Sequence, residues 1–254
     1  MSVNFRSISF KSILCFFIAA PALISSTHSE QAELPLHILY VPPAVTIGNS
    51  ATDALIVEAG SMYDSLRLKK FGLTKKAFEY AWKGYKHLLE SGRVSNKEVL
   101  SICDFSQSSR RKRLYVIDVQ ERKVLVNTYV AHGRNSGGEY ARSFSNSPDS
   151  HKSSLGFYIT SNTYYGDHGL ALKIQGVEKG INDKANERNI VVHGSQYLGD
   201  KFLRRNPFNG RSFGCPAIPT NYTPQVINSI KNGSCLFIYH PTKYYLSKSR
   251  ILNG

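Results

Sequence analysis

Residues 210–216 read Gly-Arg-Ser-Phe-Gly-Cys-Pro, and residues 190–194 read Ile-Val-Val-His-Gly. In the first stretch Gly214 directly precedes Cys215 in a turn-rich loop, where a glycine lets the backbone bend sharply. In the second stretch His193 closes an apolar strand, and Gly194 after it lets the backbone turn away from the ring. The two patterns predict a cysteine on a tight loop and a histidine whose ring can be reached at a strand end.

Cys215 and His193 together have the chemistry of a nucleophile and a base. A thiol beside an imidazole is expected to become a thiolate at neutral pH and can then attack a peptide carbonyl to form a thioester. Neighbouring N–H groups in such a loop can point at one spot, as an oxyanion requires. Each residue alone also has a structural interpretation, because a lone histidine at a strand end is more often structural and a lone cysteine is usually a small buried hydrophobe.

Other uses of these residues have less support in the sequence. A zinc site could combine His193, Cys215 and His168, but no close ligand pair such as Cys-x-x-Cys or His-Glu-x-x-His is present. A redox sensor would need a nearby resolving cysteine, which Cys215 lacks in the sequence. Papain-like enzymes place the cysteine first, whereas here the histidine precedes it by 22 positions. We therefore expect no metal and no cofactor.

The residues around these two segments predict a mostly β C-terminal part. Residues 114–119 and 124–130 read as a hairpin with a turn at 121–123. Four further strands are expected in the stretches 156–160, 171–175, 190–193 and 234–240, and a helix is expected over 224–231, ending at Gly233.

The chain before Cys103 has a different character. Residues 30–51 read as an extended lead-in, and residues 52–90 have helical periodicity. Gly72 is expected to break the helical stretch, and Thr74 to cap a second helix with an aromatic stripe. We interpret that stripe as core packing rather than a ligand platform.

The first 29 residues have the layout of a secretory signal peptide. Arg6 and Lys11 precede an apolar run from residue 13 to residue 24, and small residues follow. An uncleaved anchor is the alternative, but the run is shorter than the roughly 20 residues of a spanning helix. The chain carries a net charge of +14, and removal of residues 1–29 leaves about +12, which suits a polyanionic envelope surface. Export disfavours nucleic acid as a partner.

Three cysteines follow the predicted signal peptide, namely Cys103, Cys215 and Cys235. An odd number in an oxidising compartment leaves at least one thiol free or intermolecular. Cys103 and Cys235 either form a disulfide or are two separate buried thiols, and the sequence leaves both open.

The two motifs resemble a known signature. His193-Gly194 followed by Ser212-Phe-Gly-Cys215 is similar to the His-Gly … Ser-x-Gly-Cys pattern of L,D-transpeptidase catalytic domains, in the branch that reads Gly-Arg-Ser-x-Gly-Cys-Pro-Ala. The resemblance covers roughly residues 100–240 and includes the stretches 130–137, 144–146, 153–157, 164–169 and 235–240.

This resemblance implies a mainly β fold, an L,D-transpeptidase-like β domain preceded by a small helical segment. It implies Cys215 as nucleophile and His193 as base, with supporting roles, including the oxyanion site, for Gly194, Ser212 and Gly214. Many family members follow the cysteine with an apolar residue and then Arg, whereas Pro216 and Ala217 stand here. We expect Arg211, just before the motif, to supply a replacement charge for substrate binding.

The sequence thus predicts a signal peptide at 1–29, a lead-in and helical segment at 30–100 and a catalytic domain at 101–254. The predicted function is a periplasmic or envelope L,D-transpeptidase that acts on peptidoglycan stem peptides through a cysteine thioester. The alternatives are an L,D-carboxypeptidase that uses water as acceptor, and a non-catalytic wall-binding protein that kept the fold.

Overall fold

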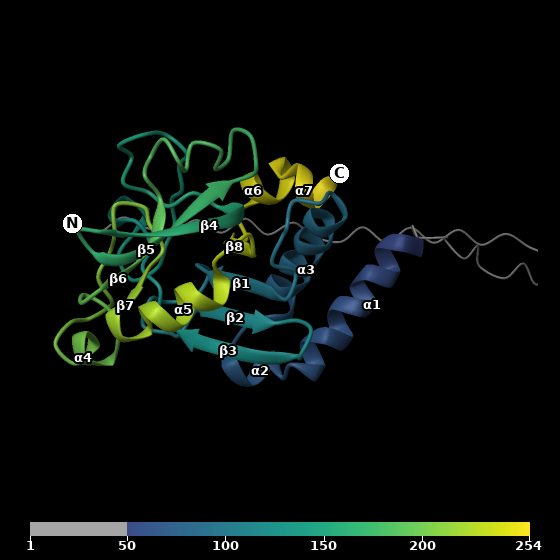
Figure 1. Cartoon of the computed structure of the whole chain (residues 1–254), viewed down its shortest axis with the longest axis horizontal. Coiled ribbons are helices and arrows are strands. Elements are labelled where there is room, and N and C mark those ends of the chain that lie inside the picture. Colours follow the sequence, from purple (N-terminus) through teal and green to yellow (C-terminus); the bar gives the residue numbers. More distant parts are fainter. Residues whose placement is uncertain (1–49) are drawn as a thin grey trace, which may run out of the picture. The chain divides into compact units, whose positions relative to one another are not determined.

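The computed structural model describes residues 50–254 (Figure 1). The predicted signal peptide and nearly all of the lead-in lie outside these residues. Within them, no helix is both long enough and apolar enough to cross a membrane.

An eight-stranded sheet forms the centre of residues 50–254, in the order β3-β2-β1-β8-β4-β5-β6-β7. The expected mainly β fold with helices before it is therefore confirmed. The strand bounds are β1 Val99–Asp104, β2 Leu114–Asp118, β3 Lys123–Thr128, β4 Gly156–Gly166, β5 Gly169–Gly176, β6 Val191–Ser195, β7 Ala217–Pro219 and β8 Cys235–Tyr239.

β1 is the strand that the sequence reading missed, because the first strand was expected after Cys103. Cys103 instead lies within β1, which pairs antiparallel with β2 and parallel with β8. Every residue of β1 is buried, so the strand lacks the apolar-polar alternation that marks a half-exposed strand. β7 was missed as well, since it has only three residues and ends on Pro219.

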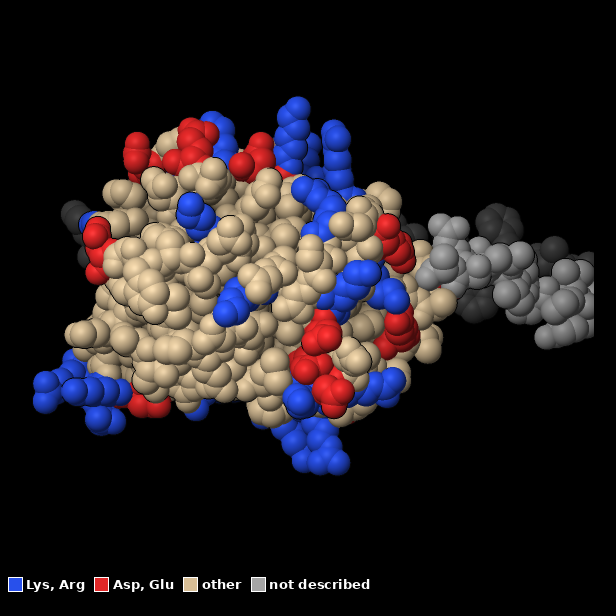
Figure 2. Space-filling model, viewed as in Figure 1, with Lys and Arg blue, Asp and Glu red and all other residues tan. Residues whose placement is uncertain are grey.

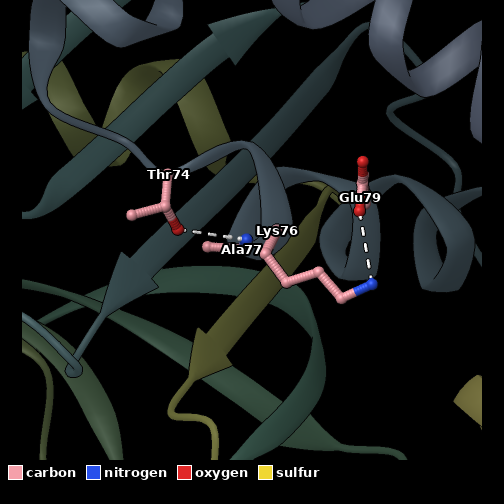
Figure 3. A network of polar contacts seen from close by, with 4 residues as sticks. All are labelled: Thr74, Lys76, Ala77 and Glu79. Carbon is pink, nitrogen blue, oxygen red and sulfur yellow. Dashed lines mark hydrogen bonds and ion pairs between the residues drawn. The ribbon is translucent and has the colours of Figure 1, made fainter.

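Three helices precede the sheet: α1 Ser50–Ser65, α2 Leu68–Phe71 and α3 Lys75–Glu90. As predicted, Gly72 ends the first helical stretch in a left-handed conformation, with φ of +86°. The Thr74 hydroxyl caps α3 by accepting a hydrogen bond from the Ala77 amide at 3.2 Å, and Lys76 pairs with Glu79 one turn along (Figure 3).

α3 packs directly on one face of the sheet. Phe78, Trp82 and Tyr85 are buried, as predicted, and the half-buried Tyr80 stacks on Tyr239 of β8. The approach is closest at Gly84, where an added Cβ would lie 1.9 Å from the ring of Phe157 in β4. A glycine is therefore needed at this position of the helix.

The opposite face of the sheet is covered by α5, Thr223–Ile230 (Figure 1). Val226 and Ile230 of α5 line a small apolar space together with Cys103 and Leu236. The remaining helices are short, namely α4 Asp200–Leu203, α6 Lys243–Lys248 and α7 Arg250–Asn253.

Cys103 and Cys235 are both free and buried, so the possible disulfide between them is not formed. In the parallel pairing of β1 with β8, Cys103 lies opposite Ile238 and Cys235 lies opposite Leu100. The two cysteines are thus three positions out of register. Because successive side chains alternate between faces, the two thiols point to opposite sides of the sheet.

Candidate functional site

The loop that carries Cys215 leads into β7, which runs parallel to β6. In this pairing Ala217 lies opposite His193, so the segment with the cysteine is the direct neighbour of the strand with the histidine. The Val191 amide at the start of β6 donates to the Cys215 Sγ at 3.5 Å, and the thiol donates to the Asn189 carbonyl at 3.7 Å. The fold therefore brings both predicted residues to one edge of the sheet.

Ser212 fixes the shape of the loop around Cys215. Its hydroxyl accepts a hydrogen bond from the Gly214 amide at 3.1 Å and donates one to the Cys215 carbonyl at 2.6 Å. Gly214 has a φ of +129°, and a Cβ there would lie 2.9 Å from the Lys152 carbonyl oxygen. Both requirements are met only by glycine, which accounts for the Gly-Cys pair.

A second segment braces the loop from its other side. Ser212 forms an isolated parallel bridge with Gly133, and its backbone N–H and C=O bond to His132 and Arg134. The chain beside it is anchored by Arg113, which is fully buried and donates to the Val130 carbonyl and to the His132 Nδ1 at 2.7 Å. The loop is thus held by buried polar contacts on both sides.

His193 is held in one tautomer by its neighbour. The Nδ1 atom lies 3.0 Å from the Gly194 carbonyl oxygen, which can only accept, so Nδ1 carries the proton. The lone pair is then on Nε2, which is the arrangement a general base needs. Burial lowers the pKa of His193 and the charge of nearby His168 lowers it further, while the bond to Gly194 raises it in part. The ring is consequently neutral at physiological pH.

Gly194 is required sterically after the histidine. A Cβ at this position would lie 2.5 Å from the Thr223 hydroxyl, at the start of α5. The glycine therefore allows β6 to pass close to α5 while its carbonyl orients the His193 ring.

The protonation state of Cys215 differs from the sequence-based expectation of a thiolate at neutral pH. Burial raises the pKa of its thiol above the ordinary 9.0, and the Val191 amide, Arg188 and the residue's own amide offset this only in part. His193 is not among these influences. The site at rest therefore holds a neutral thiol and a neutral imidazole rather than a thiolate–imidazolium pair, and a base has to remove the thiol proton during reaction.

Arg211 is not among the residues around the thiol. Its guanidinium donates to the Gly137 carbonyl at 3.1 Å and packs over the ring of Phe208. A different arginine, Arg188, approaches Cys215 instead. Sequence reasoning missed it, and the one available signal was its place just before the strand that ends on His193.

Two cavities flank this edge of the sheet. One, of about 300 Å³, adjoins the thiol through Asn189 and is lined by Pro148, Asp149, His151, Glu187, Arg188, Asn189 and Phe213. The other, of about 520 Å³, lies beyond the carboxyl ends of β6 and β7 and includes Ser195, Lys201, Arg205 and Thr220. Figure 2 shows Lys and Arg side chains protruding where Figure 1 has α4, which contains Lys201. The second cavity is thus basic, whereas the first carries both signs of charge.

Residues 69–239 match the family model of the L,D-transpeptidase catalytic domain. The chain belongs to this family. The matched region runs from α2 to β8 and includes both Cys215 and His193. A search of curated proteins gave no match.

Solved L,D-transpeptidase structures are distant from this chain. An L,D-transpeptidase from Mycobacterium smegmatis is 11% identical with a TM-score of 0.35, and the match covers 56% of this chain and 59% of that one. The helical cell shape determining protein Pgp2 from Campylobacter jejuni is 15% identical with a TM-score of 0.37, and the match covers 63% and 57% of the two chains. The chain therefore spans less than two-thirds of the length of either of these two proteins. The assignment rests on the matched domain.

Among residues 52–254 of this L,D-transpeptidase-family chain, no three His, Cys, Asp or Glu side chains gather in a way that could hold a metal ion. His168 lies against the His193 ring rather than in a ligand set with Cys215. That the protein works without a metal or a cofactor stays a prediction.

Proposed function

We propose that this protein is a cysteine-dependent acyltransferase, an L,D-transpeptidase that acts on peptidoglycan stem peptides. The observation that carries the proposal is the pairing of the two parallel strands. It sets the Cys215 loop beside the strand of His193, with the histidine fixed in the tautomer whose Nε2 can accept a proton. Family membership supports the same chemistry.

The first half-reaction transfers an acyl group to the thiol. Nε2 of His193 takes the thiol proton as the sulfur bonds to the carbonyl carbon between the L-centre and the D-centre of a tetrapeptide stem. The tetrahedral intermediate then breaks its C–N bond, and the leaving amine of the terminal D-residue takes the proton back from the imidazolium. Backbone N–H groups of the Gly214–Cys215 loop are the proposed donors to the oxyanion.

The second half-reaction decides between transfer and hydrolysis. An amine acceptor attacks the thioester, gives a proton to His193 and releases the Cys215 thiol, whereas water in the same role would make the enzyme an L,D-carboxypeptidase. Asp149 and Glu187 line the cavity next to the thiol, and neither forms an ion pair within residues 52–254. Their negative charge favours a cationic acceptor, and therefore transpeptidation over hydrolysis.

A basic cavity beyond the end of β6 offers a counterpart for substrate carboxylates. Lys201 and Arg205 line the basic cavity beyond Ser195, and no acidic residue lines it. We propose that this cavity, rather than Arg211, contributes the charge that attracts an anionic stem peptide.

The setting of the enzyme is part of the proposal. A signal peptide at 1–29 would deliver it to the periplasm or cell envelope, where its net positive charge suits a polyanionic wall. We also propose a division near residue 100, where β1 begins, between the helical segment, which carries none of the proposed catalytic side chains, and the catalytic domain at 101–254.

The test is to incubate the purified protein with defined tetrapeptide-stem muropeptides, with and without an amine acceptor, in ¹⁸O-labelled water. Cross-linked product supports the transpeptidase, and a labelled tripeptide alone supports the carboxypeptidase. Cys215→Ala is expected to reduce turnover at least about a thousandfold, and His193→Ala about a hundredfold or more. Cys103→Ala, which removes a buried thiol, is the matched control. No product from the folded wild-type protein would leave the non-catalytic wall-binding role.

A further inference from the structure

Arg188 brings a positive charge to the back of the nucleophile loop. It directly precedes Asn189, whose carbonyl accepts the hydrogen bond of the Cys215 thiol. Its guanidinium lies against Gly214, since a Cβ added there would be 3.1 Å from the Arg188 Nη2. The charge thus approaches from the β6 side of the loop, and not from the positions after the cysteine, where Pro216 and Ala217 stand.

Every hydrogen-bond partner of this guanidinium is neutral. Nη1 donates to the Ser145 carbonyl at 2.9 Å and to the Ser154 hydroxyl at 3.2 Å. Nη2 donates to the Ser150 hydroxyl and to the Lys152 carbonyl. No carboxylate forms an ion pair with Arg188 within residues 52–254. The half-buried charge is therefore oriented by four hydrogen bonds but is not neutralised.

A half-buried, unpaired cation is costly to keep unless something compensates it. Burial lowers the pKa of Arg188, and the two ionisable groups that offset this are the phenol of Tyr158 and the thiol of Cys215. Tyr158 is fully buried and burial raises its pKa beyond the physiological range, so its phenol stays neutral. The group that can become negative beside Arg188 during the reaction is the Cys215 sulfur.

We propose that Arg188 is the fixed counter-charge of the Cys215 thiolate, which forms when His193 removes the thiol proton and again when the thioester is cleaved. The inference rests on the proposed function and adds a positioning residue to it. Arg188 contributes to both half-reactions, since each begins or ends with negative charge on the sulfur. It also ties residues 145–154 to the nucleophile loop, so a test has to separate charge from scaffolding.

The titratable groups around the sulfur come from several elements, and the charge of Arg188 acts among them. The chain after β6 contributes the phenol of Tyr197, the adjoining cavity contributes Asp149, His151 and Glu187, and the neutral His193 lies on the neighbouring strand β6. Of the charged residues, Arg188 is the one that lowers the pKa of the thiol.

The test is the pH dependence of alkylation of Cys215 by iodoacetamide in the native protein. This reaction needs no substrate, Cys103 and Cys235 are buried, and peptide mapping of the fragment that contains Cys215 makes the rate specific for its thiolate. The variants are Arg188→Gln, which removes the charge, and Arg188→Lys, which keeps the charge but lacks the planar guanidinium group that forms the hydrogen bonds. Arg142→Gln is the control, because it removes one exposed positive charge from the adjoining loop.

Arg188→Gln is expected to raise the thiol pKa by about one unit and to slow alkylation about tenfold near pH 7, as loss of one close opposite charge predicts. Arg188→Lys is expected to stay within about threefold of the wild-type rate, and Arg142→Gln to match it. The proposal is overturned if Arg188→Gln leaves the pH profile unchanged, or if a folded Arg188→Lys shifts it as far as Arg188→Gln. Failure of the acyl-transfer function would appear separately, as absence of product with an intact alkylation profile.

Discussion

The imidazole of His168 stacks on that of His193, with ring centroids 4.6 Å apart and an interplanar angle of 21°. His168 lies at the tip of the hairpin formed by β4 and β5, and β5 in turn pairs with β6. The exposed ring thus covers the buried one and shields it from water. The turn between two strands thereby influences the proposed base of the reaction.

Removal of this ring is expected to change the pH dependence of activity. Burial is the largest cause that lowers the pKa of His193, and the charge of His168 adds to it. His168→Ala weakens both effects, so the His193 pKa should rise toward 6.5 and the acidic limb of the pH–rate profile should move to higher pH. Tyr165→Ala, at an 84% exposed position of the same hairpin, is the control. An acidic limb that stays in place in His168→Ala would contradict this role.

Gly214→Ala is expected to disable the nucleophile loop. The φ of +129° and the contacts of the added Cβ with the Lys152 carbonyl and the Arg188 guanidinium both force the loop to move. We expect acyl transfer to fall at least about tenfold and unfolding free energy to drop by about 1–3 kcal/mol. Gly138→Ala, where the nearest atom is 3.7 Å away, should change neither. Full activity in Gly214→Ala would mean that the loop conformation is not required.

Gly84→Ala tests the packing of α3 on the sheet. The added methyl group would lie within the ring of Phe157, so we expect a loss of about 1–3 kcal/mol in chemical denaturation despite the better helix propensity of alanine. Gly60→Ala is the matched substitution in α1. Its Cβ meets only the end of the Lys75 side chain at 3.2 Å, and it should stabilise by about 0.5–1 kcal/mol. Equal effects of the two substitutions would refute the close contact.

Glu178 predicts a pH dependence of stability. This buried carboxyl accepts hydrogen bonds from the Phe157 amide, Tyr245 and Ser249, and these offset only part of the burial that raises its pKa above 4.5. The folded state therefore holds the proton more tightly than the unfolded state, and its stability falls as pH rises from below 4.5 through the folded pKa.

Glu178→Gln cannot titrate, so its stability relative to wild type should increase between about pH 4 and about pH 8 in paired urea unfolding experiments. Glu187→Gln, at an exposed position, should show no such trend. If the free energies of unfolding of Glu178→Gln and wild type differ by the same amount at both pH values, the carboxyl has the same pKa in the folded and the unfolded state, and the prediction is wrong.

Local signals in the sequence predicted much of the fold correctly. The Gly72 break, the Thr74 cap and the hairpin of β2 and β3 each depend on a few adjacent residues, and all three are present. β1 escaped prediction because its two faces are buried by α3 and α5, and α5 is more than a hundred residues away in the chain. Secondary structure was thus predictable where neighbours in sequence determine it.

The candidate site divides in the same way. Cys215, His193 and the glycines beside them could be proposed from the sequence because their motifs are short and contiguous. Arg188 was not, because its position against Gly214 arises only when β6 pairs with the strand that follows Cys215. Arg211 was chosen for its nearness in sequence, and in the structure its contacts are with Gly137 and Phe208.

The central claim is that Cys215 carries the acyl group, and the most direct test is the mass of the intact protein after a brief reaction with a tetrapeptide-stem muropeptide, quenched in acid. We predict an added mass equal to the donor without its terminal D-residue, located by peptide mapping to the fragment that contains Cys215. The adduct should form more slowly in His193→Ala and be absent in Cys215→Ala. An adduct that persists in Cys215→Ala, or product formation by the wild type with no adduct at Cys215 at any reaction time, would contradict it.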